Sequence, residues 1–315
     1  EKLFPIILPG KSDSASMDMV VELLTHTDRS LPEIMMMMIP EAWEKHTTMS
    51  KERKAFYEYN ACIMEPWDGP ASVPFTDGDY IGALLDRNGL RPSRYTITKS
   101  GKLIMSSEII KRHGRLEPGK MFLVDMNEGR IIEDEEIKSK IVRERPYQEW
   151  LDNTRLHLKD VPYTSQTCPI ESIDIKTRQR LFNYTFEDIQ EVITPMAQVG
   201  KEALGSMGTD TPLAVLSDRP QLISNYFKQL FAQVTNPPLD GIREEIVTDI
   251  SLNLGKDRNI FSITDRHCRK LRIQNPVISN ADLEKIRSID IESFKAETIQ
   301  ILYKKSEGLN GIENA

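Results

Sequence analysis

The 315-residue sequence lacks both a long apolar run and an excess of basic residues. No apolar stretch approaches the ~20 residues that a membrane-spanning helix needs. Lys and Arg number 41 against 48 Asp and Glu, so the net charge is −7, whereas nucleic-acid-binding surfaces are usually basic. These absences favour a soluble globular protein that binds neither membranes nor nucleic acid. The length favours two domains over one.

Cysteine is also scarce. The three cysteines, Cys62, Cys168 and Cys268, are widely spaced, with no CxxC motif and no pairing pattern. Such usage is typical of a reducing compartment, so we expect a cytoplasmic protein. The sequence predicts no metal or iron–sulfur site in this stretch.

The N-terminus has no initiator Met, no signal peptide and no transit-peptide composition. It begins at Glu1 in what reads as the middle of a domain. We therefore expect the chain to be a fragment of a longer protein.

Residues 10–14, Gly-Lys-Ser-Asp-Ser, contain a GKS tripeptide typical of phosphate-binding loops. That motif needs a further glycine at position 5, which is Pro5. The spacing instead predicts a helix capped by Ser12, Asp13 or Ser14, whose buried face carries Met17, Val20, Val21 and Leu24. On spacing alone, capping is favoured over a catalytic role.

Two more helices are expected before residue 65. Ser30 and Pro32 form a helix-start signature, and the four methionines Met35–Met38 are interpreted as core residues. Another helix is predicted over 51–63, with Ala55, Tyr59 and either Cys62 or Ile63 buried. Residues 65–70, EPWDGP, end it.

Residues 71–134 are predicted to form an antiparallel meander, because strand-like runs alternate with Gly-containing turns. We expect Tyr80–Leu85 and Tyr95–Thr98 to form a sheet ribbon. Its charged connection contains Asn88-Gly89, with Arg87 before and Arg91 after. A helix over 133–142 follows. Segregated helices and antiparallel strands indicate an α+β fold or a layered sandwich.

The second half reads differently. Residues 146–178 are interpreted as an extended connector, with the domain boundary near 165–178. Beyond it, alternating helices and short strands suggest α/β. Thr185 is predicted to cap a helix, and the glycines between 200 and 208 are less suited to phosphate binding. Further expectations are a buried stripe of Ile189, Val192, Ile193 and Met196, a buried strand over 213–216, a helix over 221–232 with a broad apolar face, and a solvated basic face over 266–272.

Several blocks of the sequence look like one family. They include KSDSASMD (11–18), NACIMEPWDGPAS (60–72), DRNGLRPSRYTIT (86–98) and the tract 184–245. The chain resembles the large subunit of glutamate synthase over nearly all its length. The tract 184–245 is the most specific, since class II glutamine amidotransferases in general carry blocks similar to the first and third.

The resemblance implies three regions. Residues 1–160 would be the C-terminal part of a class II amidotransferase domain, with part of the αββα sandwich of N-terminal-nucleophile hydrolases. Residues 161–177 would be a connector, and 178–315 the N-terminal part of an α/β central domain. In the family, an N-terminal cysteine releases ammonia from glutamine. The ammonia passes to a flavin domain, where FMN and an iron–sulfur cluster support reductive formation of glutamate from 2-oxoglutarate.

Residue by residue, the resemblance implies little of that chemistry here. The nucleophile and the oxyanion hole would lie upstream of Glu1, so no catalytic residue is expected. Asp13 would accept the α-amino group of glutamine, with Ser12 or Ser14 beside it. Asp68, Arg87, Asn88 and Arg91 would be structural or support the site from behind.

The partners implied are glutamine, the flavin domain of the large subunit and an electron donor. The donor stays open between an NADPH-oxidising subunit, an NADH-dependent region and ferredoxin. A plastid location is left open beside the cytoplasm. A second reading is a catalytically inactive module that docks a partner through the apolar helix face at 222–231. An amidotransferase that feeds another acceptor is disfavoured by the tract 184–245.

Overall fold

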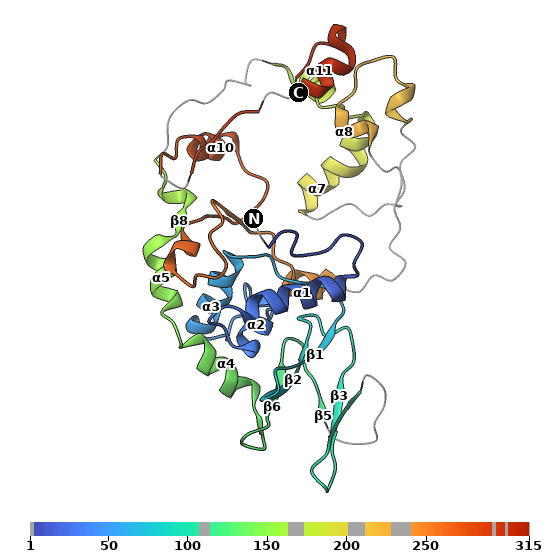
Figure 1. Cartoon of the computed structure of the whole chain (residues 1–315). Helices are drawn as coiled ribbons and strands as arrows, with labels where there is room; N and C mark the ends of the chain where they lie inside the picture. The colour runs from blue at the N-terminus through green and yellow to red at the C-terminus, as the bar shows by residue number, and fades with distance from the viewer. Residues whose placement is uncertain are drawn as a thin grey trace. The chain divides into compact units, whose positions relative to one another are not determined.

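The computed structural model describes residues 3–106, 114–162, 173–200, 212–227, 241–291, 294–299 and 302–314. The chain divides into two units (Figure 1). The first contains residues 1–166 and 240–315, and the second contains residues 167–239.

Three helices begin the first unit: α1 (Asp13–Thr25), α2 (Leu31–Met38) and α3 (Lys51–Ala61) (Figure 1). Each begins at a serine whose hydroxyl accepts a hydrogen bond from a backbone N–H three residues on; these are Ser12, Ser30 and Ser50. The predicted starts are confirmed, because a serine hydroxyl at this position satisfies an N–H that the helix leaves unpaired. No described helix is long and apolar enough to cross a membrane.

The core of the first unit lies around α2 and α3. All four predicted methionines, Met35–Met38, are buried, as are Ala55 and Tyr59 of α3. The ring of Tyr147, from α5 (Tyr147–Thr154), packs against Phe56 and Tyr59 at centroid distances of 5.3 and 4.9 Å. Leu24 at the end of α1 is fully buried in the same cluster.

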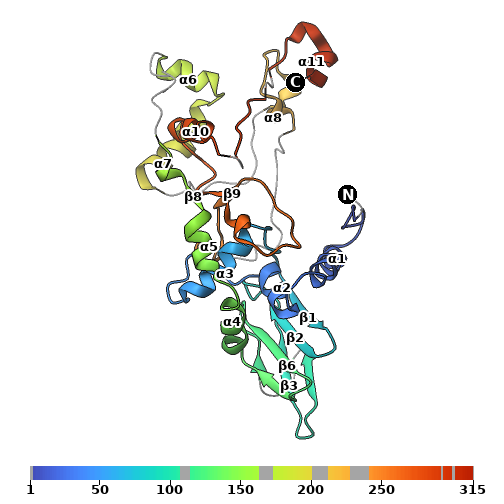
Figure 2. The ribbon, with the colours of Figure 1, turned by 60° about the vertical axis from the view of Figure 1, so that its left-hand side comes forward.

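Two antiparallel sheets follow α3. One has the order β1-β2-β6-β7, and the other has the order β4-β3-β5. Their bounds are β1 Ser72–Thr76, β2 Tyr80–Leu85, β3 Arg94–Ile97, β4 Leu103–Ser106, β5 Gly114–Arg115, β6 Met121–Asp125 and β7 Arg130–Ile132. Helix α4 (Asp134–Val142) lies beside β6 (Figure 2). The predicted antiparallel pairing is confirmed, but the strands form two sheets and not one meander. The fold is mixed α+β with antiparallel sheets.

The expected ribbon of Tyr80–Leu85 with Tyr95–Thr98 is wrong. Strand β2 pairs with β1 and β6, whereas β3 pairs with β4 and β5 in the other sheet. The connection contains Pro92, which has no N–H to donate to a ladder, so the chain leaves the first sheet before β3 begins.

A third sheet joins distant parts of the first unit. Strand β10 (Leu271–Ile273) lies between β8 (Leu156–His157), to which it is parallel, and β9 (Leu252–Leu254), to which it is antiparallel. The remaining elements of this unit are η1 Leu158–Asp160, α9 Gly241–Val247, η5 Asp265–Cys268, α10 Asn280–Arg287, η6 Lys305–Glu307 and α11 Gly308–Asn314.

The solvated basic face expected at 266–272 is wrong. His267, Cys268, Lys270 and Arg272 are all buried. The segment contains the central strand of a sheet, and its buried cations are paired. Lys270 Nζ lies 2.6 Å from Asp257, and Arg272 Nη1 lies 3.0 Å from Glu58. Acidic partners distant in sequence thus make this burial possible.

The second unit is made of short helices. They are α6 Ile175–Leu181, the π-helix η3 Asp188–Ile193, α7 Thr194–Val199, η4 Ala214–Leu216 and α8 Ile223–Tyr226. Thr185 Oγ1 accepts from Asp188 N–H at 3.0 Å, and Asp188 Oδ2 accepts from Thr185 N–H at 2.9 Å. This reciprocal pair confirms the predicted helix start.

The predicted burial in this unit is wrong for the described residues. Val192, Ile193 and Met196 are exposed, and the expected strand at 213–216 is the exposed single turn η4. Helix α8 covers four residues of the expected 221–232, while 228–231 and the glycines of 201–208 lie outside the described residues. Apolar spacing predicts which face of a helix would pack away from water. Among the described residues of this unit, however, none is buried.

Candidate functional site

The predicted Ser12–Ser14 group lies at the start of α1. Ser12 accepts from Ala15 N–H at 3.3 Å, and its hydroxyl lies 3.2 Å from that of Ser14. Asp13 is exposed in the first helical turn. Ser12 therefore supplies the cap, which leaves the Asp13 carboxylate able to pair with an ammonium group at a helix end that favours negative charge.

The charged turn after β2 is organised by Asp86, a buried residue absent from the predicted site. Its Oδ1 accepts from Asn88 N–H and Gly89 N–H, both at 2.9 Å, and its Oδ2 accepts from Ala71 N–H at 3.2 Å. One carboxylate thus satisfies three backbone donors. An Asp two residues before Asn-Gly is a local signal of such a turn.

Three of the predicted supporting residues lie together. Arg87 Nη2 donates to Asp68 Oδ2 at 2.5 Å, and Asn88 Nδ2 donates to Asp68 Oδ1 at 3.3 Å. Burial by itself would raise the pKa of Asp68, but the Arg87 ion pair outweighs it and the pKa lies below its usual range. Asp68 is therefore ionised at neutral pH. Arg91 is exposed.

A cavity of about 790 Å³ opens beside the Asp68–Arg87 pair. Its wall also includes Trp43, Glu44 and Asp249. Burial raises the pKa of the half-buried Glu44, and the Asp249 carboxylate adds to this, while Arg87 and Arg272 oppose it. The Glu44 and Asp249 carboxylates, which both line this cavity, thus repel each other.

Arg272 holds the far wall of the cavity. Its guanidinium lies 3.0 Å from Glu58 and 3.9 Å from Asp249, and it sits over the Trp43 ring at 5.3 Å from the centroid. Glu58 also forms an ion pair with Arg155, with 2.7 Å between Glu58 Oε1 and Arg155 Nη1. The sequence did not indicate this cluster, because its members are far apart along the chain. They lie before α3 (Trp43), in α3 (Glu58), after α5 (Arg155), after α9 (Asp249) and in β10 (Arg272).

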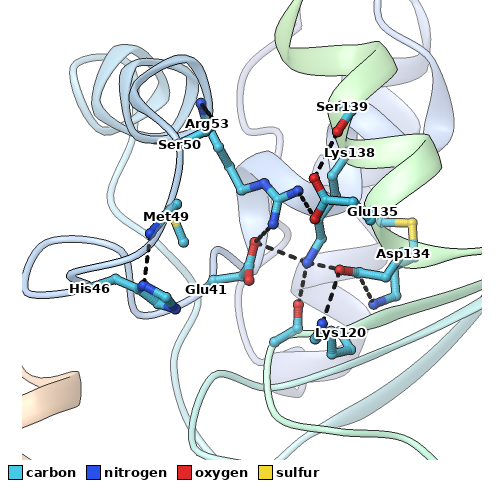
Figure 3. A network of polar contacts seen from close by, with 12 residues as sticks. Glu41, His46, Met49, Ser50, Arg53, Lys120, Asp134, Glu135, Lys138 and Ser139 are labelled. Carbon is cyan, nitrogen blue, oxygen red and sulfur yellow. Dashed lines mark hydrogen bonds and ion pairs between the residues drawn. The ribbon is translucent and has the colours of Figure 1, made fainter.

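A second network of polar contacts surrounds Lys138 (Figure 3). Lys138, which is fully buried, points toward Glu41 and Asp134, with Nζ–O distances of 3.0 and 2.8 Å. Its Nζ also donates to the Gly119 carbonyl at 2.6 Å. Tyr57 donates to Glu41 at 2.8 Å, and burial together with the Glu41 charge raises the pKa of that phenol.

Gly119 links this network to the charged turn. Its N–H donates to the Asp86 carbonyl at 3.1 Å, while its own carbonyl accepts from Lys138. Lys138 therefore supports the Asp86–Gly89 turn through the backbone of one residue, Gly119. The i,i+4 spacing of Asp134 and Lys138 was a readable signal for part of this network, but Glu41 was not.

The family resemblance implies an iron–sulfur cluster in the intact protein, and the described residues of this chain offer few ligands for one. The described residues hold no group of three or more His, Cys, Asp or Glu side chains placed to bind a metal. An iron–sulfur cluster is held mainly by cysteines, and the two described ones are buried side by side. The described residues therefore do not fit such a cluster.

Comparison with known proteins gives two family matches along the chain. Residues 1–150 match the family of glutamine amidotransferases class-II, and residues 177–315 match the glutamate synthase central domain. The two regions follow one another without overlap.

Curated relatives match nearly the whole chain. The large chain of NADPH glutamate synthase from Bacillus subtilis is 45% identical, over 96% of this chain and 20% of the relative. The NADH glutamate synthase of Schizosaccharomyces pombe is 43% identical over 98% and 16%, and ferredoxin-dependent glutamate synthase 2 of Synechocystis is 38% identical over 100% and 21%. The chain spans about a fifth of the length of these relatives. With its amidotransferase region followed by a central-domain region, the chain belongs to the glutamate synthase family.

Proposed function

We propose that this chain is part of a glutamate synthase that takes ammonia from glutamine and uses it to form glutamate reductively from 2-oxoglutarate. The observation that carries the proposal is the order of the two matched regions, an amidotransferase region and then a glutamate synthase central domain. The relatives that match both regions are glutamate synthases by name.

In this proposal, residues 1–160 are the C-terminal part of the amidotransferase domain and contribute to an αββα sandwich. Residues 161–177 connect it to 178–315, the N-terminal part of an α/β central domain. The antiparallel sheets with helix α4 beside β6 are compatible with such a layered arrangement. The nucleophilic cysteine and the oxyanion hole belong to parts of the protein outside this chain.

Asp13 is the proposed contact for the α-amino group of glutamine, with Ser12 and Ser14 holding the helix start. Its exposed carboxylate lies in the first turn of the 13-residue helix α1, and Ser12 already supplies the cap. Asp68, Arg87 and Asn88 are assigned a supporting role, because their polar groups are engaged with one another. Arg91 is grouped with them on its place in the same sequence block.

The remaining chemistry is assigned to the intact protein. FMN and an iron–sulfur cluster would carry electrons in the flavin domain, and the protein would work in the cytoplasm or in a plastid. The relatives are named for NADPH, NADH or ferredoxin, so all three donors remain open.

The test is Asp13→Asn in the full-length enzyme. Losing one charge-assisted contact to an ammonium, worth about 1.5–3 kcal/mol, should raise the KM for glutamine about ten- to a hundredfold. The ammonia-dependent rate should stay unchanged. Asp18→Asn, an exposed position on the same helix, is the matched control. Equal losses in the glutamine- and ammonia-dependent rates of the Asp13 variant would contradict the assignment.

A second candidate is a catalytically inactive module that docks a partner through residues 222–231. Its support is the exposure of Leu222, Ile223 and Phe227, at 55%, 58% and 84%. The coding sequence upstream of Glu1 distinguishes the two candidate functions. An open reading frame that continues upstream to a processed cysteine favours the synthase, and a start codon just before Glu1 favours the docking module.

A further inference from the structure

Two cysteines far apart in the sequence meet in the core of the first unit. Cys62 follows the last residue of α3, and Cys268 ends the short helix η5. Both are free and buried, with 2% and 0% of their surface exposed, and both belong to one apolar cluster. Their thiols interact with each other, and the rings of the nearby residues Tyr59 and His267 pack edge to face, with 6.0 Å between their centroids.

The surroundings make the two thiols unequal. The interaction with Cys268 is the main cause that lowers the pKa of Cys62, and the Arg155 and Lys270 charges add to it. The same interaction, together with burial, raises the pKa of Cys268. Cys62 is therefore the better nucleophile, since the thiolate is the reactive form, and Cys268 keeps its proton.

A small oxidant has a short route to this pair. The residues on either side of Cys62, Ala61 and Ile63, both line the 790 Å³ cavity, as does Lys270. The chain on either side of Cys62 thus borders a space large enough for water-sized molecules.

We propose that Cys62 and Cys268 are a disulfide-forming pair that peroxide oxidises in the folded protein. The Cys62 thiolate attacks hydrogen peroxide, which gives a sulfenic acid at Cys62 and releases hydroxide. The Cys268 sulfur then attacks the Cys62 sulfur, forms the S–S bond and displaces the sulfenic oxygen, which leaves as water with the Cys268 proton. Two thiol electrons reduce one peroxide overall.

The bond would change how two parts of the first unit are held together. Helix α3 and the segment around η5 otherwise contact each other through non-covalent bonds, such as Tyr59 Oη to the Thr264 carbonyl at 3.1 Å. A disulfide here would prevent the segment from separating from α3. The inference is independent of the proposed function, because it depends only on contacts within this unit.

The experiment treats the native protein with hydrogen peroxide, blocks free thiols by alkylation and identifies linked peptides by mass spectrometry after proteolysis. We expect a Cys62–Cys268 peptide that dithiothreitol reverses, in a protein lighter by two hydrogen atoms. Cys62→Ser and Cys268→Ser should each abolish it.

Cys168→Ser is the control, because it removes the third cysteine and should leave the linked peptide at its wild-type yield. The proposal is overturned if the native protein keeps both thiols in the reduced state. It is equally overturned if the link forms only after denaturation, or if Cys62 and Cys268 link to Cys168 as readily as to each other.

Discussion

Two buried charges of the first unit, Lys138 and Glu33, each have several partners. Lys138 contacts two carboxylates and a carbonyl, and Glu33 accepts from Arg145 at 2.7 Å and from Tyr147 at 3.4 Å. Burying an ion is costly unless its hydrogen-bonding capacity is filled, so these groups hold several chain segments in one arrangement. The i,i+4 spacing could predict Asp134 as a partner of Lys138. The other partners could not be predicted, because they lie far away along the chain.

His267 gives a pH-dependent prediction at this scale. Burial lowers the pKa of His267 from 6.5, although its ring also contacts the Ser262 carbonyl at 2.6 Å; Tyr59, Arg29, Lys270 and Arg258 surround it. Below pH 6.5 the unfolded chain binds a proton that the folded protein binds less well. The free energy of unfolding should therefore decrease as pH falls through 6.5, by at most about 1.4 kcal/mol per pH unit.

The test is urea unfolding of wild type and His267→Gln between pH 7.5 and 5.5, a range chosen to bracket about 6.5. The variant should lose this part of the slope, whatever its absolute stability. His157→Gln is the control, because His157 is exposed. Identical slopes in wild type and His267→Gln would contradict the prediction.

Turns and helix ends are the elements that the sequence predicts best, because their chemistry is local. The three serine caps and the Thr185 cap are within three residues of the N–H groups that they accept. The partner strands of β2 and β3 were not predictable in this way. Strand β2 pairs with β6 and β3 pairs with β4, and both partners lie beyond the turn. Local turn chemistry indicates where a strand ends but not which strand it joins.

Gly89 allows a test of the charged turn. Its φ is +63°, and an added Cβ would lie 2.4 Å from Pro118 Cγ. Gly101 has a φ of +80° but faces open space. Gly101→Ala should therefore lose about 1–2 kcal/mol from backbone strain, and Gly89→Ala about 2–4 kcal/mol because it must also displace Pro118. Urea unfolding of both variants measures the difference, and equal losses would show that the Pro118 contact carries no cost.

At the scale of the molecule, the first unit is not continuous in sequence. Strand β10 pairs with β8, which follows α5, and Arg243 donates to the Asn88 carbonyl of the charged turn. Residues matched to the central domain thus complete the fold around the amidotransferase region. Spacing along the chain could not reveal this, since nothing local marks a strand as the centre of a sheet. The expectation of an extended connector from residue 146 is wrong for 147–160, which form α5, β8 and η1.

The contribution of these long-range contacts to the position of β10 can be tested at Glu58. It pairs with Arg155 at 2.7 Å and with Arg272 at 3.0 Å, and all three side chains are at most one-fifth exposed. Glu58→Ala should cost about 3–5 kcal/mol, because two guanidinium groups lose their buried carboxylate. Amide hydrogen exchange should show reduced protection in β10.

Glu284→Ala is the matched control, since its pair with Arg287 is a more exposed i,i+3 contact. We expect a change of less than about 0.5 kcal/mol there and unaltered exchange in β10. A Glu58 variant that behaves like the Glu284 variant would show that the cluster does not hold β10 in place.

Taken by itself, the sequence determined the helix caps, the strand segments between residues 72 and 132, the methionine core and, through its family blocks, the glutamate synthase family. Each of these depends on residues close together along the chain. Tertiary structure alone decided that the basic segment at 266–272 is buried, that Cys62 meets Cys268, and that β2 and β3 belong to different sheets. These features arise from contacts between distant residues, whose energies depend on burial and on charge partners that no local pattern records.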